Sequence, residues 1–242
     1  MTVGNPSPKQ LGTLVAALTE RHRISEVGER SQIRMGATPV PLRHDVIIGA
    51  GFIPVRGLRT KVTTIERVWS LPDTMGPDMQ ILICGLNPSP SAADDGIGFA
   101  KPGNRFWPAA LQAGIVSRDR DADHALQHHG IGMTDLVKRT TPKASELTDD
   151  EYRFGLERIE RLASVFQPGS ICFVGLAGWR VAVDRKATAG WQSRTLGAIP
   201  VYVMPSTSGL NASTQLPGFV THLRNAALTV VVNQPEGDSS RK

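Results

Sequence analysis

The stretch QILICGLNPSPSAADDGIGFAKPGNRFW, residues 80–107, decides the fold. It starts with a short apolar run, residues 80–84, which leads directly into a loop rich in Gly, Pro and Ser. Residues 104–114 then show helical spacing and end on a glycine. A buried strand followed by a loop and a helix is the repeating unit of a parallel sheet that helices cover on both faces. The stretch therefore predicts an α/β fold.

The rest of the chain repeats this alternation. Apolar runs predict further strands at residues 131–137, 170–175 and 199–204. Helical spacing predicts one helix whose last residues are 124–129 and three more helices at 149–166, 177–185 and 216–230. We expect a three-layer α/β/α domain over residues 66–232, with a short, mainly parallel central sheet of about four strands.

Residues 1–65 carry the excess positive charge of the chain. They hold nine Lys or Arg against four Asp or Glu, whereas residues 66–235 hold sixteen of each, so the net charge of +5 originates in the N-terminal region. Only residues 11–23 show a helical stripe there. We expect a basic, partly disordered N-terminal arm and a disordered tail at residues 233–242. The arm either contacts a polyanion such as DNA, or only aids solubility, or reflects a start codon placed too far upstream.

Composition excludes several classes of protein. The chain is 40% hydrophobic and 20% charged, which is typical of a globular protein. No apolar run approaches the ~20 residues of a membrane helix, and no signal-peptide core occurs in the first thirty residues, so we expect a cytoplasmic protein. Cys84 and Cys172 lie in apolar runs, which favours buried, reduced thiols over a disulfide or a metal site.

Two loops are the expected sites of chemistry. In parallel sheets ligands bind at the carboxyl ends of the strands, where the loops 85–98 and 205–212 begin. The first loop lacks the Lys-Ser/Thr of a phosphate-binding P-loop and the glycine spacing of a dinucleotide-binding turn. It also contains no Lys or Arg, which weighs against a protein that acts on free nucleotides.

Three segments in order resemble the signatures of one family. They are GLNPSPSAADDGIGFAKPGNRFWP (85–108), MTDLVKRTTPKASEL (133–147) and MPSTSGLNAS (204–213). They resemble the mismatch-specific uracil/thymine-DNA glycosylases, a branch of the uracil-DNA glycosylase superfamily, over residues 71–230. The resemblance implies a monofunctional hydrolase of base excision repair that removes uracil, chiefly opposite guanine, and leaves an abasic site.

The same resemblance implies the partners and the cofactor requirement. Double-stranded DNA with G:U-type mismatches is the implied substrate, the protein is expected to be a monomer, and neither a metal nor an organic cofactor is implied. Thymine, modified cytosine, uracil opposite adenine and single-stranded uracil stay open as substrates. A non-catalytic DNA-lesion-binding module with the same fold is the alternative.

Five residues of the first motif correspond to base-handling positions of the family. Asn87 matches the residue that positions the attacking water. Its neutral amide can only orient the water and cannot act as a base. The alternative to this catalytic role is that Asn87 stabilises the loop through an Asx turn. Phe99 matches the aromatic ring on which the extruded base stacks. Backbone N–H groups near Leu86 and Phe99 are implied to hold the leaving base, and Ser91 and Ala92 to line the approach to the pyrimidine 5-position.

The third motif supplies the implied DNA wedge. The run Ser208-Gly209-Leu210 matches the segment that enters the duplex, with Leu210 filling the space of the flipped nucleotide. Backbone N–H groups from Ser206 to Gly209 are expected to bind the neighbouring phosphate. Arg105 is expected to reach a phosphate as well.

Asp135 departs from the family pattern, which commonly has Asn or Lys at this position. A carboxylate facing the pocket would polarise the water or stabilise positive charge on the deoxyribose, so we expect Asp135 to be catalytic. A helix cap or an ion pair with Lys138 or Arg139 is the alternative. Two competing carboxylates, Asp94 and Asp95, lie in the first motif.

Overall fold

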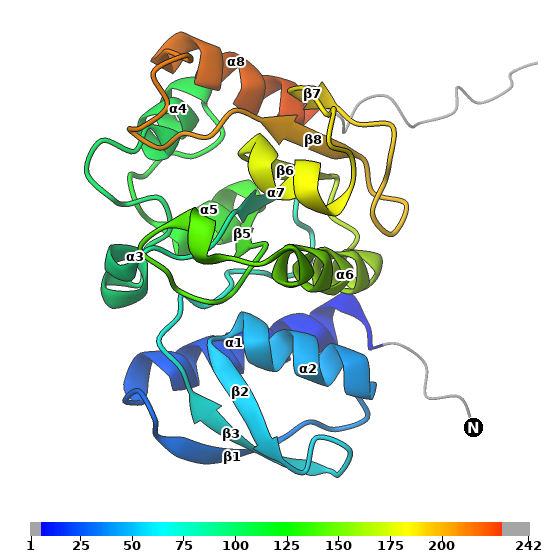
Figure 1. Cartoon of the computed structure of the whole chain (residues 1–242). Coiled ribbons are helices and arrows are strands. Elements are labelled where there is room, and N and C mark those ends of the chain that lie inside the picture. Colours follow the sequence, from blue (N-terminus) through cyan, green and yellow to red (C-terminus); the bar gives the residue numbers. More distant parts are fainter. Residues whose placement is uncertain (1–5, 229–242) are drawn as a thin grey trace, which may run out of the picture.

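The computed structural model describes residues 6–228 of the chain. Its central sheet has five strands in the order β5-β4-β6-β8-β7 (Figure 1). Four of them run parallel, and the short β7 pairs antiparallel with β8. The strands are β4 (Ile81–Gly85), β5 (Ile131–Asp135), β6 (Ser170–Val174), β7 (Gly190–Trp191) and β8 (Val201–Met204). The predicted mainly parallel α/β fold is confirmed; β7 has too few residues to give a sequence signal.

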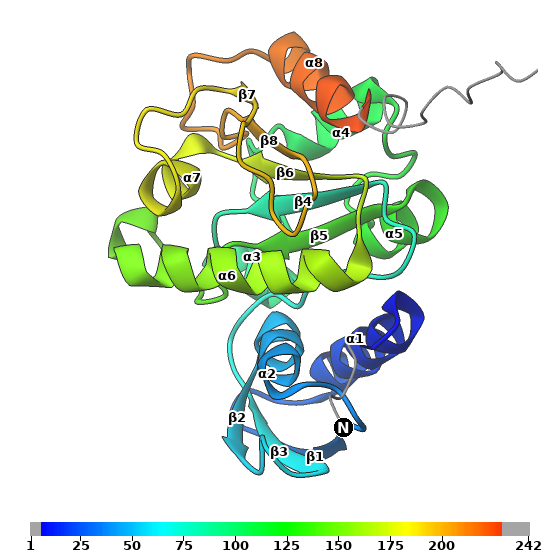
Figure 2. The ribbon, with the colours of Figure 1, turned by 90° about the vertical axis from the view of Figure 1, so that its right-hand side faces the viewer.

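Helices cover both faces of this sheet (Figure 2). One face carries α4 (Phe106–Ala113) and α8 (Leu216–Ala227), and the opposite face carries α6 (Asp149–Phe166). The remaining elements are α3 (Pro90–Asp95), α5 (Ala122–His129), the 3-10 turn η1 (Ala144–Glu146) and α7 (Leu176–Ala182). The predicted tail at 233–242 lies outside the described residues.

The strands divide their side chains between two hydrophobic clusters. Ile81 and Ile83 of β4 pack with α4 and α8, whereas Leu82 and Cys84 belong to the cluster that contains α6. This alternation follows from the two-residue period of a strand. Both cysteines are free and buried, as the sequence predicts.

Residues 8–67 differ from the predicted arm, because they fold into an α/β unit of their own. Helices α1 (Pro8–Ile24) and α2 (Val40–Gly49) lie on one face of an antiparallel sheet with the order β1-β3-β2. Its strands are β1 (Arg30–Arg34), β2 (Phe52–Arg56) and β3 (Val62–Arg67). Each strand is short and one face of the sheet is solvent-exposed, so few apolar residues mark this unit in the sequence.

This N-terminal unit packs against α6 and shares a core with it (Figure 2). Leu18 and Ile47 of the unit lie in the same hydrophobic cluster as Ile159 of α6. Arg161 of α6 donates two hydrogen bonds to the fully buried carboxylate of Asp45 in α2, at 2.7 and 3.0 Å. Helix α6 therefore lies between the central sheet and the N-terminal unit and packs against both.

A buried charge cluster centred on Asp73 connects the N-terminal unit to the central sheet. The Asp73 carboxylate is 3% exposed and accepts hydrogen bonds from Lys138 Nζ at 2.7 Å, Thr134 Oγ1 at 2.8 Å and Arg158 Nη2. Its backbone N–H donates to the carbonyl of Gly49, the last residue of α2, at 2.8 Å. Asp73 thus contacts β5, the loop after β5 and α6 through its carboxylate, and the end of α2 through its backbone N–H.

Among residues 6–228, no helix is both long and apolar enough to cross a membrane. Within the same range, no three His, Cys, Asp or Glu side chains lie together in an arrangement that could hold a metal ion.

Replacing Asp73 by Asn should lower the free energy of unfolding by about 3–5 kcal/mol, because it leaves two buried cations without a counter-charge. Urea denaturation followed by circular dichroism measures this loss. The control is Glu157→Gln, which removes an exposed ion pair with Arg161 on the same helix as Arg158 and should cost less than about 0.5 kcal/mol. Equal losses in the two variants would contradict the role of the cluster.

Candidate functional site

A cavity of about 720 Å³ lies at the carboxyl edge of the central sheet. The segments that follow β4, β5 and β8 form its wall. Eight of the predicted site residues line it, namely Leu86, Asn87, Ala92, Phe99, Asp135, Ser206, Ser208 and Leu210. Three others, Ser91, Arg105 and Gly209, are not among the lining residues. We call this cavity the base pocket.

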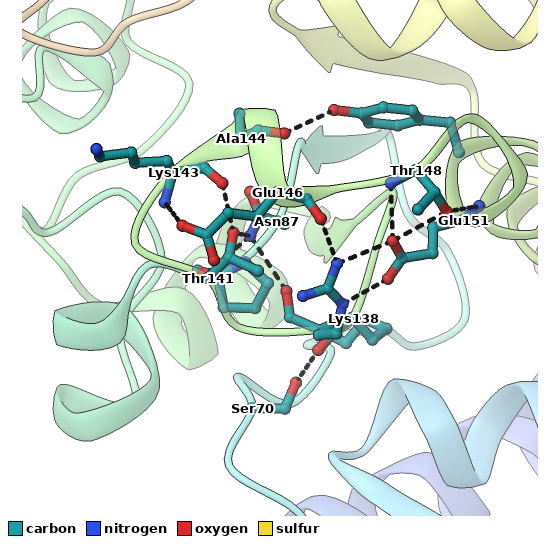
Figure 3. Close-up of polar contacts among 12 residues, drawn as sticks. Ser70, Asn87, Lys138, Thr141, Lys143, Ala144, Glu146, Thr148 and Glu151 are labelled. Atoms are coloured by element: carbon teal, nitrogen blue, oxygen red, sulfur yellow. Dashed lines mark hydrogen bonds and ion pairs between the residues drawn. The ribbon is translucent and has the colours of Figure 1, made fainter.

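The amide of Asn87 is held in one orientation (Figure 3). Its Nδ2 group donates to Thr141 Oγ1 at 2.8 Å and to the carbonyls of Pro88 and Arg139, each at 3.1 Å. The Thr141 hydroxyl in turn donates to the carbonyl of Lys143 at 3.0 Å. Because the nitrogen side of the amide is occupied, Oδ1 is the group that Asn87 can offer to a bound molecule.

Asp135 ends β5 directly beside Gly85, its register partner on β4. A Cβ atom at Gly85 would overlap the Asp135 Oδ1 atom and would lie 3.3 Å from the Phe99 ring. The absence of a side chain at position 85 therefore lets the carboxylate and the ring approach the same point of the strand end. This places the carboxylate of Asp135 in the wall of the base pocket.

Burial governs the charge state of Asp135. The residue is 7% exposed, and burial raises the pKa of its carboxyl group to about 6. The Lys138 and Arg158 cations oppose this effect and lower the pKa, whereas the Asp73 carboxylate raises it further. Near neutral pH, Asp135 is thus a mostly ionised carboxylate that takes up a proton on mild acidification.

The alternative roles of Asp135 are not observed. Lys138 binds Asp73, and Arg139 forms a two-pronged ion pair with Glu151 at 2.6 and 2.9 Å. Within residues 6–228, Asp135 forms no ion pair and caps no helix. Its carboxylate is therefore available to a molecule in the pocket.

The competing carboxylates lie elsewhere. Asp94 accepts a hydrogen bond from Trp69 Nε1 at 2.8 Å. Asp94 and Asp95 both line a second cavity, between α1, α3 and α5, which contains Asp135 in its wall but not Asn87. The structure therefore does not bring Asp94 or Asp95 together with Asn87.

Phe99 is fixed between the pocket and the core. Its ring stacks on Phe106 at a centroid distance of 4.3 Å and an interplanar angle of 24°. Its backbone has a φ of +60°, a left-handed conformation that costs a non-glycine residue about 1–2 kcal/mol. Trp107, which is buried, donates from Nε1 to the carbonyl of Gly98 at 2.8 Å and holds the adjacent peptide. Strain at Phe99 is thus sustained by packing around the pocket.

Arg105 organises the loop that follows β8. Its guanidinium donates to the carbonyls of Thr214 at 2.8 Å, Ser208 at 2.9 Å and Asn211, and lies 4.8 Å from the ring centroid of Phe219. These contacts give Arg105 a structural role, and its expected contact with a phosphate stays a prediction. A lone Arg at a helix start gives no sign in the sequence that its partners are carbonyls one hundred residues away.

The loop held by Arg105 presents Leu210 to solvent. Leu210 is 94% exposed, more than any other large apolar residue between positions 6 and 228. The Ser206 and Ser208 hydroxyls accept weak hydrogen bonds from the N–H groups of Ser208 and Leu210, at 3.3 and 3.4 Å. Gly209 passes close to the Gly103 carbonyl, since a Cβ there would lie 3.1 Å from that oxygen. The loop is ordered by internal contacts while its leucine stays free.

Several pocket residues have no role in the sequence-based interpretation. Lys143 and Thr141 come from the segment after β5, and Lys101 from the loop before α4. Single Lys and Thr residues carry no spacing signal, so only the folded arrangement identifies them. Ser91, in contrast, pairs with Ser89 at 3.1 Å on α3.

Comparison with known proteins gives a family for most of the chain. The model of the Uracil DNA glycosylase superfamily matches residues 72–230, which contain the central sheet and the base pocket. A similar solved structure is the solution NMR structure of a putative uracil DNA glycosylase from Methanosarcina acetivorans, with 24% identity and a TM-score of 0.46. That match covers 64% of this chain and 95% of the other.

Replacing Arg105 by Lys should loosen the loop at residues 206–214, because an ammonium group cannot bond three separate carbonyls in the geometry of a guanidinium. Hydrogen exchange should accelerate in this loop while β4 stays protected. The control is Arg224→Lys, since Arg224 bonds carbonyls at the end of α4 instead. Unchanged exchange of the loop in Arg105→Lys would show that other contacts hold it.

Proposed function

Because the chain belongs to the uracil DNA glycosylase superfamily, we propose that it hydrolyses the N-glycosidic bond of uracil in mismatched duplex DNA, chiefly opposite guanine, and leaves an abasic site. Superfamily membership implies DNA as the substrate. The narrower, mismatch-specific assignment rests on the three sequence motifs. The observation that carries the proposal is that one pocket combines the Asn87 amide, the Asp135 carboxylate and the Phe99 ring, with Leu210 exposed at its rim.

Base extrusion uses the exposed leucine and the stacking ring. Unpairing and unstacking a nucleotide costs a few kcal/mol and less at a mismatch, which favours mismatched uracil over paired uracil. Leu210 fills the space left in the duplex, and the flipped base enters the pocket and stacks on Phe99. Arg105 acts as a positioning residue, because it fixes the backbone from which Leu210 projects.

The water attack requires two groups with different capacities. Asn87 Oδ1 accepts one hydrogen of the water and orients it, but an amide cannot take up a proton. As the water oxygen bonds to C1′ of the deoxyribose, the C1′–N1 bond breaks and its electron pair leaves with the base. The Asp135 carboxylate accepts the water proton and offsets the positive charge that develops on the sugar. A pKa of about 6 keeps this base ionised at neutral pH.

Other pocket groups select and anchor the substrate. Leu86 and Ala92 line the base pocket, and Ser91, on the same helix as Ala92, is retained as a proposed determinant of whether thymine enters. Lys101 and Lys143 are proposed as phosphate ligands in addition to Arg105, because both line the pocket and are exposed. The N–H groups of Ser206–Gly209 remain the proposed contacts beside the flipped sugar.

An excision panel tests the proposal. The wild-type protein should release uracil fastest from U:G, and more slowly from U:A and from single-stranded DNA, with T:G as the test of the 5-methyl group. Asn87→Ala should lower single-turnover excision by about 10²-fold because the water loses its orientation. Asp135→Asn should lower it by about 10²–10⁴-fold because the proton acceptor is lost.

Matched controls are Asn225→Ala on α8 and Asp150→Asn, whose side chain is almost fully exposed on α6. Both should excise at the wild-type rate. Binding of U:G duplex without formation of an abasic product would overturn the enzymatic proposal. Full activity in Asp135→Asn alone would remove Asp135 from the mechanism.

The pH dependence follows from the charge state of Asp135. Protonated Asp135 cannot accept the water proton, so single-turnover excision of U:G should fall as the pH drops below about 6 and level off above it. In Asp135→Asn the residual rate should lose this step. A wild-type rate that stays constant between pH 5 and pH 8 would contradict the assignment of Asp135 as the base.

A further inference from the structure

The outer face of the N-terminal sheet carries a concentration of positive charge. Cross-strand partners share a face in an antiparallel sheet, so Arg34 lies beside Val62, and Gln32 beside Thr64, which also pairs with Arg56. The inner face carries Ile65 and packs on the core shared with α1 and α2. The outer face is therefore the exposed side of this sheet.

Four exposed cations on or beside this face have no counter-charge. They are Arg34, Arg56, Arg59 and Lys61, and within residues 6–228 none of them forms an ion pair. Arg59 and Lys61 belong to the turn between β2 and β3, and the Lys61 carbonyl accepts from the N–H of Met35, next to Arg34. The sequence of the three strands and this turn contains a single acidic residue, Glu66, which is paired with Arg30.

A shallow hollow of about 440 Å³ lies in the middle of the face. Arg30 on β1 and Arg56 on β2 border it, and Gln32 and Thr64 supply polar side chains between them. Guanidinium groups and hydroxyls are the side chains that contact phosphate and sugar in nucleic acids. The hollow is thus suited in chemistry to a sugar–phosphate backbone.

We propose that this basic sheet face, defined by Arg34, Arg56, Arg59 and Lys61, is a second DNA-binding surface that holds undamaged duplex through its phosphates. The proposal rests on the proposed function for DNA as the substrate, but it does not involve the base pocket. Charge complementarity identifies the occupant, because the whole net charge of +5 arises in the N-terminal region while the remainder is balanced. Such binding is independent of sequence and keeps the protein near DNA between damaged sites.

The test compares binding of an undamaged 30-base-pair duplex over a range of salt concentrations. In the variant with all four cations replaced by Gln, the slope of log K against log[salt] should fall by about 3–4, because each lost phosphate contact removes about 0.9. Affinity at about 0.1 M salt should fall at least tenfold. Single-turnover excision from a short U:G duplex at saturating protein should stay unchanged.

In a control variant, four arginines that already form ion pairs with carboxylates are replaced by Gln, so that the formal charge falls by the same amount. These are Arg118, Arg120, Arg153 and Arg194, each exposed and paired with Asp or Glu. If this control loses as much affinity as the sheet-face variant, net charge alone drives binding and the proposal fails. It also fails if the sheet-face variant binds undamaged duplex like wild type.

Failure of the proposed function gives a different result. A wild-type protein that excises no uracil from U:G would end the glycosylase proposal and leave the binding comparison intact. Because the four cations are exposed and unpaired, the Gln variant should melt at the wild-type temperature. The single variants Arg34→Gln and Lys61→Gln provide the same test, because each should lower the slope of log K against log[salt] by about 0.9.

Discussion

The buried carboxylate of Asp73 is the constraint on which the remaining structure depends. It pairs with Lys138 and Arg158, two cations that would otherwise be buried without a counter-charge, and the backbone N–H of the same residue binds the Gly49 carbonyl at the end of α2. The same two cations lower the pKa of Asp135, against the larger effect of burial. The N-terminal unit supplies none of these charged groups and no residue of the pocket wall, and it meets the cluster through the Gly49 carbonyl, which accepts from the Asp73 N–H.

The sequence predicts the central sheet well and the N-terminal unit poorly, for a physical reason. Parallel strands buried on both faces appear as continuous apolar runs, such as the one that ends at Cys84, whereas half-exposed strands such as β1 leave few apolar residues to detect. The strand-end rule and the motifs predicted that Asn87 and Asp135 belong to one site, and both residues line the same cavity. The role of Arg105 could not be predicted, because its carbonyl partners lie far away in the chain.

Charge is segregated around the molecule in a way that favours one direction of approach for a polyanion. The cavity beside α1, α3 and α5 contains Asp94, Asp95 and three aspartates of segment 119–123, which outnumber the three arginines of the same wall, Arg23, Arg67 and Arg120. The base pocket instead has Lys101 and Lys143 in its wall. The proposed DNA substrate is therefore expected to approach the second cavity rather than the first, although both contain Asp135.

The missing side chain at Gly85 has a consequence for sequence variation. Because Asp135 Oδ1 occupies the space of a Cβ at position 85, a side chain there is incompatible with the present position of the Asp135 carboxylate. Alanine at 85 therefore requires that the residue at 135 be shortened or turned away, whereas the residue at 135 can change while glycine stays at 85. The coupling between the two positions runs in one direction, and the order in which they change matters.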